Sequence, residues 1–127
     1  MTADKRLFAL RGATQCKNDP QDIVEQVAAL YDDLLVRNKL EEPDLVSVIF
    51  SVTADLDILN PATALRKSGR AGEAALFSLQ ESAAKGSLPR TIRVLIHCYM
   101  AEGAVPRYVY RNGAEVLRPD HAAEGTR

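Results

Sequence analysis

Hydrophobic side chains recur at every second position along residues 91–100, in the sequence TIRVLIHCYM. Alternate side chains of a strand point to opposite faces, so this pattern predicts a β-strand with one buried face. The residues of that face are Ile92, Val94, Ile96, Cys98 and Met100. The other face is also mostly apolar, yet Arg93 lies in its middle, and arginine is almost never fully buried without a partner. Arg93 is therefore a candidate functional residue.

Residues 18–40 contain the clearest helical pattern of the chain. Asp19 is a suitable N-cap, Pro20 fits the first helical position, and Asp22 follows three residues after the cap. Arg37, Asn38 and Lys39 are typical of a helix end. Apolar residues at helical spacing form a stripe that must pack on a sheet: Ile23, Val27, Leu30, Tyr31, Leu34 and Leu35.

Three more segments have the composition of strands. Segment 44–56 is rich in β-branched residues and too continuously apolar to be an exposed edge. The chain end predicts a final hairpin or bend around Asn112 and Gly113. The ranges of these segments are 6–16, 44–56 and 74–82 for the strands, and 107–110 with 114–120 for the final hairpin or bend.

A short helix is predicted over residues 60–69, with Asn60 as its cap, Pro61 at its first position and Gly69 at its end. These elements indicate a single α+β domain of one long helix, one short helix and five or six strands over residues 1–120. We expect the tail, 121–127, to be mobile. One long helix covers only one face of a sheet, so we infer a homo-oligomer whose sheets pack on one another.

The overall charge gives no reason to expect a polyanionic partner. The 16 basic and 17 acidic residues leave a net charge of −1, so we expect neither nucleic-acid nor membrane binding, and any anion must be held by a local cluster. Eleven of the basic residues are arginine, which favours bidentate recognition of carboxylates. The base content of a genome can produce the same bias, and both explanations remain open.

Targeting and redox signals are weak. The two cysteines, Cys16 and Cys98, are far apart and form no CxxC or metal-binding pattern, which indicates a reduced compartment. The start, MTADKRLFAL, lacks an apolar signal core, and no run approaches the ~20 apolar residues of a membrane span. We therefore expect a soluble, cytoplasmic protein.

The usual catalytic sets are poorly represented. The two histidines, His97 and His121, have no third group beside them in a motif, which disfavours a nucleophilic triad or a metal site. We expect His97 to be a packed, hydrogen-bonded strand residue. A different set remains: Arg11, Arg66, Glu81, Arg93, Tyr110 and Arg118. Each alone suggests a salt bridge or an exposed face. Together they suggest a pocket in which guanidinium groups and a phenol bind two carboxylates.

Five blocks then resemble one known family. They are LRGAT at 10–14, SVTADLDILNPATALRKSG at 51–69, SLQES at 78–82, SLPRTIRV at 87–94 and VLRPD at 116–120. In this order and spacing they resemble the chorismate mutases of the trimeric bacterial type, over nearly the whole chain. RGAT alone is weak support, whereas five blocks in register are specific.

The resemblance implies a mixed β-sheet backed by helices and a homotrimeric pseudo-α/β-barrel with active sites at the subunit interfaces. It implies the rearrangement of chorismate to prephenate, a Claisen-type bond exchange in aromatic amino-acid synthesis. This reaction requires no cofactor, metal, nucleophile or proton transfer, which fits the lack of the usual catalytic sets.

The resemblance also assigns roles. It places Arg93 at the ether oxygen of chorismate and an adjacent carboxylate. Arg11 is similar to an arginine that holds a carboxylate, with Tyr110 assisting it. Glu81 is similar to a glutamate that accepts a hydrogen bond from the ring hydroxyl. Further substrate contacts are implied for Arg66, Ser78, Asn60, Leu117 and Arg118, with Arg66 at the neighbouring subunit's edge and Arg118 at the mouth of the cleft.

Some positions depart from the family pattern. Asn60 stands where a phenylalanine usually lines the pocket, Thr63 where a charge is common, and Ser78 where the best-known members have cysteine. Asn60 supports one alternative, a non-catalytic protein that binds a carboxylate metabolite. A second alternative is a related trimer with imine deaminase chemistry, against which the SVTADL, LQES and TIRV blocks argue.

Overall fold

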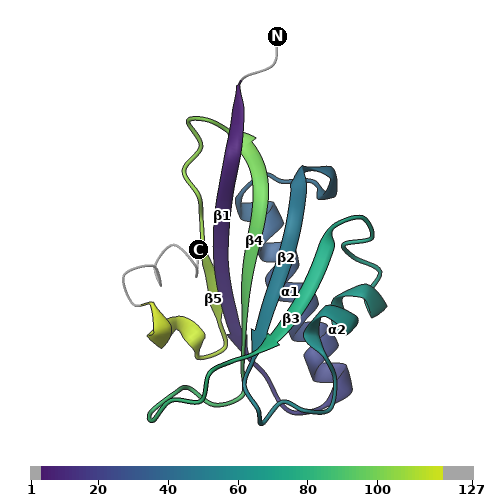
Figure 1. The fold of residues 1–127 in the computed structure, drawn as a ribbon, viewed down its shortest axis with the longest axis vertical. Helices are drawn as coiled ribbons and strands as arrows, with labels where there is room; N and C mark the ends of the chain where they lie inside the picture. The colour runs from purple at the N-terminus through teal and green to yellow at the C-terminus, as the bar shows by residue number, and fades with distance from the viewer. Residues whose placement is uncertain (1–3, 119–127) are drawn as a thin grey trace.

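The computed structural model describes residues 4–118 (Figure 1). The predicted tail and His121 therefore lie outside the described residues. The chain folds in the order β1 (Lys5–Gln15), α1 (Pro20–Arg37), the 3-10 helix η1 (Glu42–Asp44), β2 (Leu45–Val52), α2 (Pro61–Lys67), β3 (Ala75–Gln80), β4 (Thr91–Ala101), β5 (Val109–Arg111) and the 3-10 helix η2 (Ala114–Leu117).

The five strands form one mixed sheet with the order β3-β2-β4-β1-β5. β4 pairs antiparallel with both β1 and β2, whereas β2 pairs parallel with β3 and β1 pairs parallel with β5. The mixed sheet predicted from the sequence is confirmed, and β2 is an interior strand as its continuous apolar pattern indicated.

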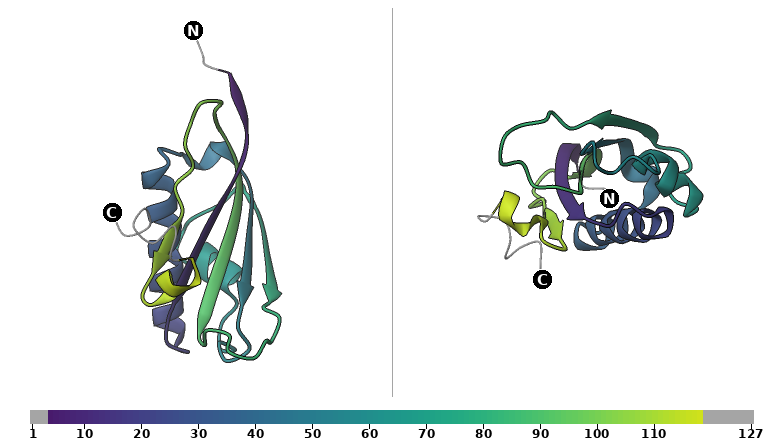
Figure 2. Two further views of the ribbon diagram at one scale, coloured as in Figure 1. Left: turned by 90° about the vertical axis from the view of Figure 1, so that its left-hand side faces the viewer. Right: turned by 90° about the horizontal axis from the view of Figure 1, so that it is seen from below.

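Both α-helices lie on one side of the sheet (Figure 2). α1 begins where the sequence predicted, because the Asp19 carboxylate accepts a hydrogen bond from the Asp22 backbone N–H at 2.9 Å. Its apolar stripe packs on the sheet, with Ile23, Val27 and Leu30 fully buried. The main core therefore lies between α1 and the sheet face that α1 covers, here called the covered face.

Gly12 allows α1 to approach β1 closely. A Cβ at this position would lie 2.9 Å from the Val109 carbonyl oxygen and 3.1 Å from side-chain atoms of both Leu30 and Leu34. The glycine of the RGAT block thus faces the helix, and its neighbour Arg11 points to the opposite face of the sheet.

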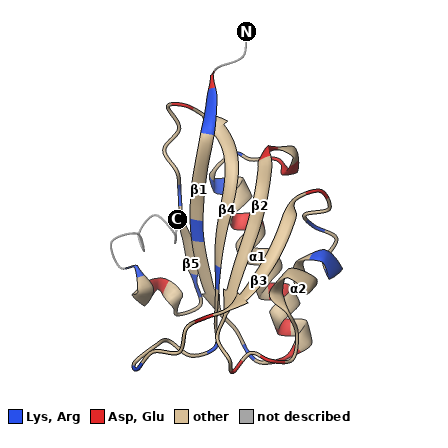
Figure 3. Ribbon diagram, viewed as in Figure 1, with Lys and Arg blue, Asp and Glu red and all other residues tan. Residues whose placement is uncertain are grey.

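The other face, here called the open face, carries neither α-helix (Figure 2). Its apolar side chains remain half exposed, with Leu7 at 46%, Leu79 at 50% and Phe77 at 60%. Figure 3 shows that the strands are mostly uncharged, with basic positions on β1 and β4. A single chain therefore leaves one side of its sheet without an α-helix, as the element count predicted.

Three predicted strands need correction. The strand expected over 44–56 ends at Val52, because Thr53 donates a side-chain hydrogen bond to Asp55 and turns the chain. The strand expected over 74–82 is only six residues long. The chain does bend at Asn112 and Gly113, both with positive φ, but η2 follows and no hairpin strand forms over 114–118.

No helix within residues 4–118 is long and apolar enough to span a membrane. Cys16 and Cys98 are both buried free thiols, and burial raises the pKa of each to about 11. Both cysteines are therefore protonated and poorly reactive at neutral pH.

Candidate functional site

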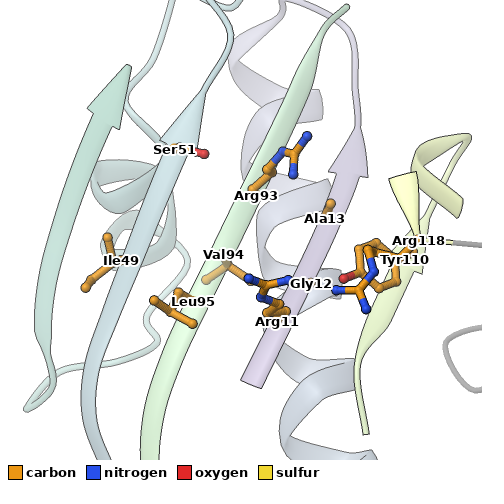
Figure 4. A pocket seen from close by; sticks show the side chains of 10 residues that line it. All are labelled: Arg11, Gly12, Ala13, Ile49, Ser51, Arg93, Val94, Leu95, Tyr110 and Arg118. Atoms are coloured by element: carbon orange, nitrogen blue, oxygen red, sulfur yellow. The ribbon is translucent and has the colours of Figure 1, made fainter. Parts of the chain in front are cut away.

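The pairing of β1 with β4 brings two arginines to the open face. Arg93 lies opposite Ala13 on β1, and Arg11 lies opposite Leu95 on β4. The Arg93 side chain is 48% exposed, so a ligand can reach its guanidinium group. Both arginines line a pocket of about 270 Å³ (Figure 4). Its lining residues are Arg11, Gly12, Ala13, Ile49, Ser51, Arg93, Val94, Leu95, Tyr110 and Arg118.

Tyr110 and Arg118 form one side of this pocket (Figure 4). β5 places Tyr110 beside Ala13, where it is only 4% exposed, and Leu117 packs against the same small cluster. Burial raises the pKa of the Tyr110 phenol, and the charges of Arg118, Arg11 and Arg93 oppose that rise. The net rise keeps Tyr110 protonated at neutral pH, so its hydroxyl can donate a hydrogen bond to an anion.

Glu81 approaches the pocket from the end of β3. Its Oε2 lies 3.6 Å from the Nε of Arg93, and its Oε1 accepts a hydrogen bond of 2.5 Å from the Ser51 hydroxyl. A distance of 3.6 Å is an ion pair without a close hydrogen bond. The Arg93 guanidinium thus lies beside a carboxylate but keeps its N–H groups available to a ligand.

Positive charge exceeds negative charge in the pocket. Three arginines line or border it, and Glu81 is the carboxylate beside them. Within residues 4–118, no hydrogen bond or ion pair joins the side chain of Arg11 to another residue. Such an arrangement suits a ligand with two carboxylates, because guanidinium groups form paired hydrogen bonds with these groups.

Three predicted site residues lie elsewhere, at the β3 edge of the sheet. Asn60 caps α2, since its Oδ1 accepts hydrogen bonds from the backbone N–H groups of Ala62 and Thr63 at 2.8 and 3.3 Å. The Ser78 hydroxyl donates to the same oxygen at 2.9 Å. Arg66 lies in the last turn of α2. We call Asn60, Ser78 and Arg66 the edge group, which one chain does not bring into the pocket.

The predicted packing of His97 agrees with the structure. Its Nδ1 lies 2.9 Å from the Ser47 hydroxyl, and His97 is half-buried on β4 outside the pocket lining. Across residues 4–118, no group of three or more His, Cys, Asp or Glu side chains is arranged to hold a metal ion.

Sequence reasoning assigned no role to Ser51, which lines the pocket and contacts Glu81. Alternation along β2 is the only signal that could have indicated its face. Its neighbours Arg93 and Leu79 depend on the register of β2 with two other strands, which the sequence does not specify.

Comparisons with known proteins identify the family. The family model "Chorismate mutase type I" matches residues 7–121. The chain is 30% identical to the chorismate mutase AroH of Bacillus subtilis, over 87% of this chain and 89% of that protein. It is 37% identical to the chorismate mutase AroH of Thermus thermophilus, over 87% and 93% of the two chains.

A solved structure extends the likeness to the fold. The chorismate mutase from Clostridium thermocellum superposes with a TM-score of 0.79 and 38% identity, covering 87% of this chain and 99% of that one. Because the family model spans most of the chain and two relatives are at least 30% identical, the chain belongs to the chorismate mutase type I family.

Proposed function

We propose that the protein rearranges chorismate to prephenate in the pocket on the open face, a step of aromatic amino-acid synthesis. The observation that carries this proposal is the arrangement of Arg11, Arg93 and Tyr110 on adjacent strands, with Glu81 beside Arg93 but not bonded closely to it. Family membership supports the same reaction. Residues 1–120 then serve as one catalytic domain, in the cytoplasm, where thiols such as those of the two cysteines stay reduced.

Binding has to fold the substrate. Chorismate carries two carboxylates, and its enolpyruvyl arm must lie over the ring before the new carbon–carbon bond can form. Arg11 and the protonated Tyr110 can hold one carboxylate from β1 and β5, and Arg118 with Leu117 can close the same side. Holding the compact conformer removes the entropic cost of reaching it during the reaction.

Arg93 has the main catalytic role in this proposal. Negative charge grows on the ether oxygen as the carbon–oxygen bond breaks, so a fixed guanidinium group stabilises the transition state more than the substrate. Positive charge develops on the ring, where the Glu81 carboxylate can accept a hydrogen bond from the ring hydroxyl. The ion pair at 3.6 Å keeps these two groups adjacent.

A second copy of the chain would complete the site. The pocket extends over β2, β4, β1 and β5 and does not include the edge group at β3, so a neighbouring chain could supply the edge group to it. The half-exposed apolar side chains of the open face supply a surface for such contacts. We therefore propose a homotrimer in which Asn60, Ser78 and Arg66 of one chain border the pocket of its neighbour.

The test is the conversion of chorismate by purified protein, measured as the loss of chorismate absorbance and the appearance of prephenate. Arg93→Ala, prepared in the same way, controls for a contaminating host enzyme, and Arg6→Ala controls for removal of an arginine outside the pocket. We expect saturable conversion by the wild type and by Arg6→Ala, and none above background by Arg93→Ala. A folded, inactive wild type would contradict the proposal. Carboxylate binding without turnover, or activity on imino acids, would then support one of the two alternatives.

The same assay can test whether the site is shared between chains. Activity per chain should fall when dilution dissociates the oligomer, with the oligomeric state followed by light scattering at each concentration. A fully active monomer would contradict the shared site and leave the reaction itself unaffected.

A further inference from the structure

We propose that Ser51 is a positioning residue that holds the Glu81 carboxylate beside Arg93. This inference rests on the proposed function. In it, the Ser51 hydroxyl affects the reaction through the position of Glu81 and not through a contact of its own with the substrate. Its basis is a pair of contacts that both involve Glu81, at the end of β3: the Ser51 hydroxyl on β2 donates to Oε1, and Oε2 lies 3.6 Å from the Nε of Arg93 on β4.

Ser51 has a rigid place in the sheet. It is the second-last residue of β2, and its Cα lies opposite Leu79 on β3 and Arg93 on β4. Because both neighbouring strands pair with β2, the backbone at Ser51 is held on both sides. Its hydroxyl therefore has a fixed origin on the open face, on the strand that lies between β3 and β4.

Glu81 needs such a support because it follows the last residue of β3. One backbone hydrogen bond still joins it to the sheet, from the Glu81 N–H to the Val52 carbonyl oxygen at 2.8 Å. Beyond this bond the side chain has three rotatable torsions. The 2.5 Å contact from the Ser51 hydroxyl fixes Oε1 and thereby directs Oε2 toward Arg93.

Ser51 keeps the Glu81 carboxylate near Arg93 without a close hydrogen bond between the two. Without the hydroxyl, Glu81 could rotate into solvent or form a close hydrogen bond with the Arg93 guanidinium. The first movement removes the group that accepts from the ring hydroxyl, and the second occupies the cation that the ether oxygen requires. Ser51 prevents both, since one of the two carboxylate oxygens is already engaged.

The test compares three variants of β2 in the chorismate assay. Ser51→Ala removes the hydroxyl, Ser51→Thr keeps it, and Ser47→Ala removes a hydroxyl on the same face that contacts His97 outside the pocket. We expect Ser51→Ala to lower kcat about tenfold with KM changed less than about threefold, as for loss of a group that acts mainly in the transition state. Ser51→Thr should recover most of kcat, and Ser47→Ala should match the wild type.

A double-mutant cycle with Glu81→Ala separates positioning from direct contact. If Ser51 acts through Glu81, adding Ser51→Ala to Glu81→Ala should cost no further activity. An equal, additive loss in that background would overturn the inference, as would an unchanged kcat in Ser51→Ala alone. Thermal unfolding of each variant at one protein concentration shows that it folds. An inactive wild type would overturn the proposed function and this inference with it, whereas an active wild type with a fully active Ser51→Ala would overturn only the inference.

Discussion

The covered and open faces of the sheet are built from the same strands but have opposite properties. On β4, Ile92, Val94 and Ile96 point to the covered face and are at most 4% exposed. Arg93 and Leu95 alternate with them on the open face and line the pocket. Residues adjacent in sequence therefore serve stability on one side of the sheet and ligand contact on the other.

This difference shows how a small α+β domain can place charge in the middle of a sheet. An arginine on the covered face would need a buried partner, and desolvation would make it costly. On the open face, Arg11 and Arg93 keep access to solvent until a ligand or another chain covers them. The site thus depends on the face that α1 leaves uncovered.

The largest effects should come from neighbouring substitutions on β4. Arg93→Ala should raise the barrier for the chemical step by ~3 kcal/mol or more and leave the free energy of unfolding nearly unchanged. Ile92→Ala should do the reverse, because loss of a fully buried Ile side chain costs about 2–5 kcal/mol of stability. Steady-state kinetics and denaturant unfolding, at one protein concentration, measure the two quantities.

If either variant changed the reaction barrier and the free energy of unfolding to a similar extent, the two faces would not have separate roles. Loss of kcat in folded Ile92→Ala would show that the core sets the geometry of Arg93. A strongly destabilised Arg93→Ala would show that its ion pair with Glu81 contributes more than an exposed pair normally does.

A smaller effect is expected at Gly12, next to Arg11. Gly12→Ala places a Cβ within 3.1 Å of Leu30 and Leu34, so α1 must shift, at a cost of about 1–3 kcal/mol in the free energy of unfolding. Gly103→Ala is the matched control, because a Cβ there would meet nothing within 4 Å. Equal stability of the two variants in urea unfolding would contradict close packing of α1 on β1.

At the edge group, Asn60→Ala should cost about 1 kcal/mol of stability through loss of the cap of α2. Asn60→Asp keeps an accepting oxygen and should retain most of that stability. Asn60→Phe introduces the residue that the resemblance leads us to expect there but also loses the cap, so its unfolding free energy should resemble that of Asn60→Ala. An unchanged stability in Asn60→Ala would show that Ser78 and the backbone hold α2 without Asn60.

The smallest effect concerns pH. We expect kcat to vary little between about pH 6 and 9, because the proposed mechanism needs no proton transfer by a side chain and His97, the strand histidine within residues 4–118, lies outside the pocket. The pKa of Tyr110 is raised, so its phenol stays protonated below the ordinary tyrosine value of about 10 and is lost as a donor only above it. A bell-shaped profile with an inflection near pH ~6.5 would contradict this mechanism.

Local patterns predicted most of the elements. Asp19 with Pro20 marked the start of α1, and Asn60 with Pro61 marked the start of α2, because capping depends on a few adjacent residues. Strand ends were less accurate. The apolar pattern continues past Val52, but hydrogen bonds of Thr53 with Asp55 and Leu56 turn the chain there.

The site was harder to predict than the fold. Alternation placed Arg93 on a strand face, the predicted elements singled out Arg11, Tyr110 and Arg118 with it, and the family resemblance supplied their roles. The position of Ser51 beside Glu81 could not be inferred, because it results from strand registers that are set by the whole sheet. Adjacent residues predicted that Asn60 caps α2, which the structure confirms, whereas its implied place in a pocket depends on a second chain.

The place of β1 in the sheet also affects how the chain folds during synthesis. β1 is made first, yet its partners come last: Lys5 pairs with Ala101, and Gly12 pairs with Val109. Such distant pairings slow folding, because the entropy cost of closing a long loop precedes the stabilising contacts that offset it. During synthesis, the apolar side of β1 is therefore exposed before β4 is available to pair with it. α1 follows β1 directly in the chain and is the first element that can cover this side and protect it from aggregation.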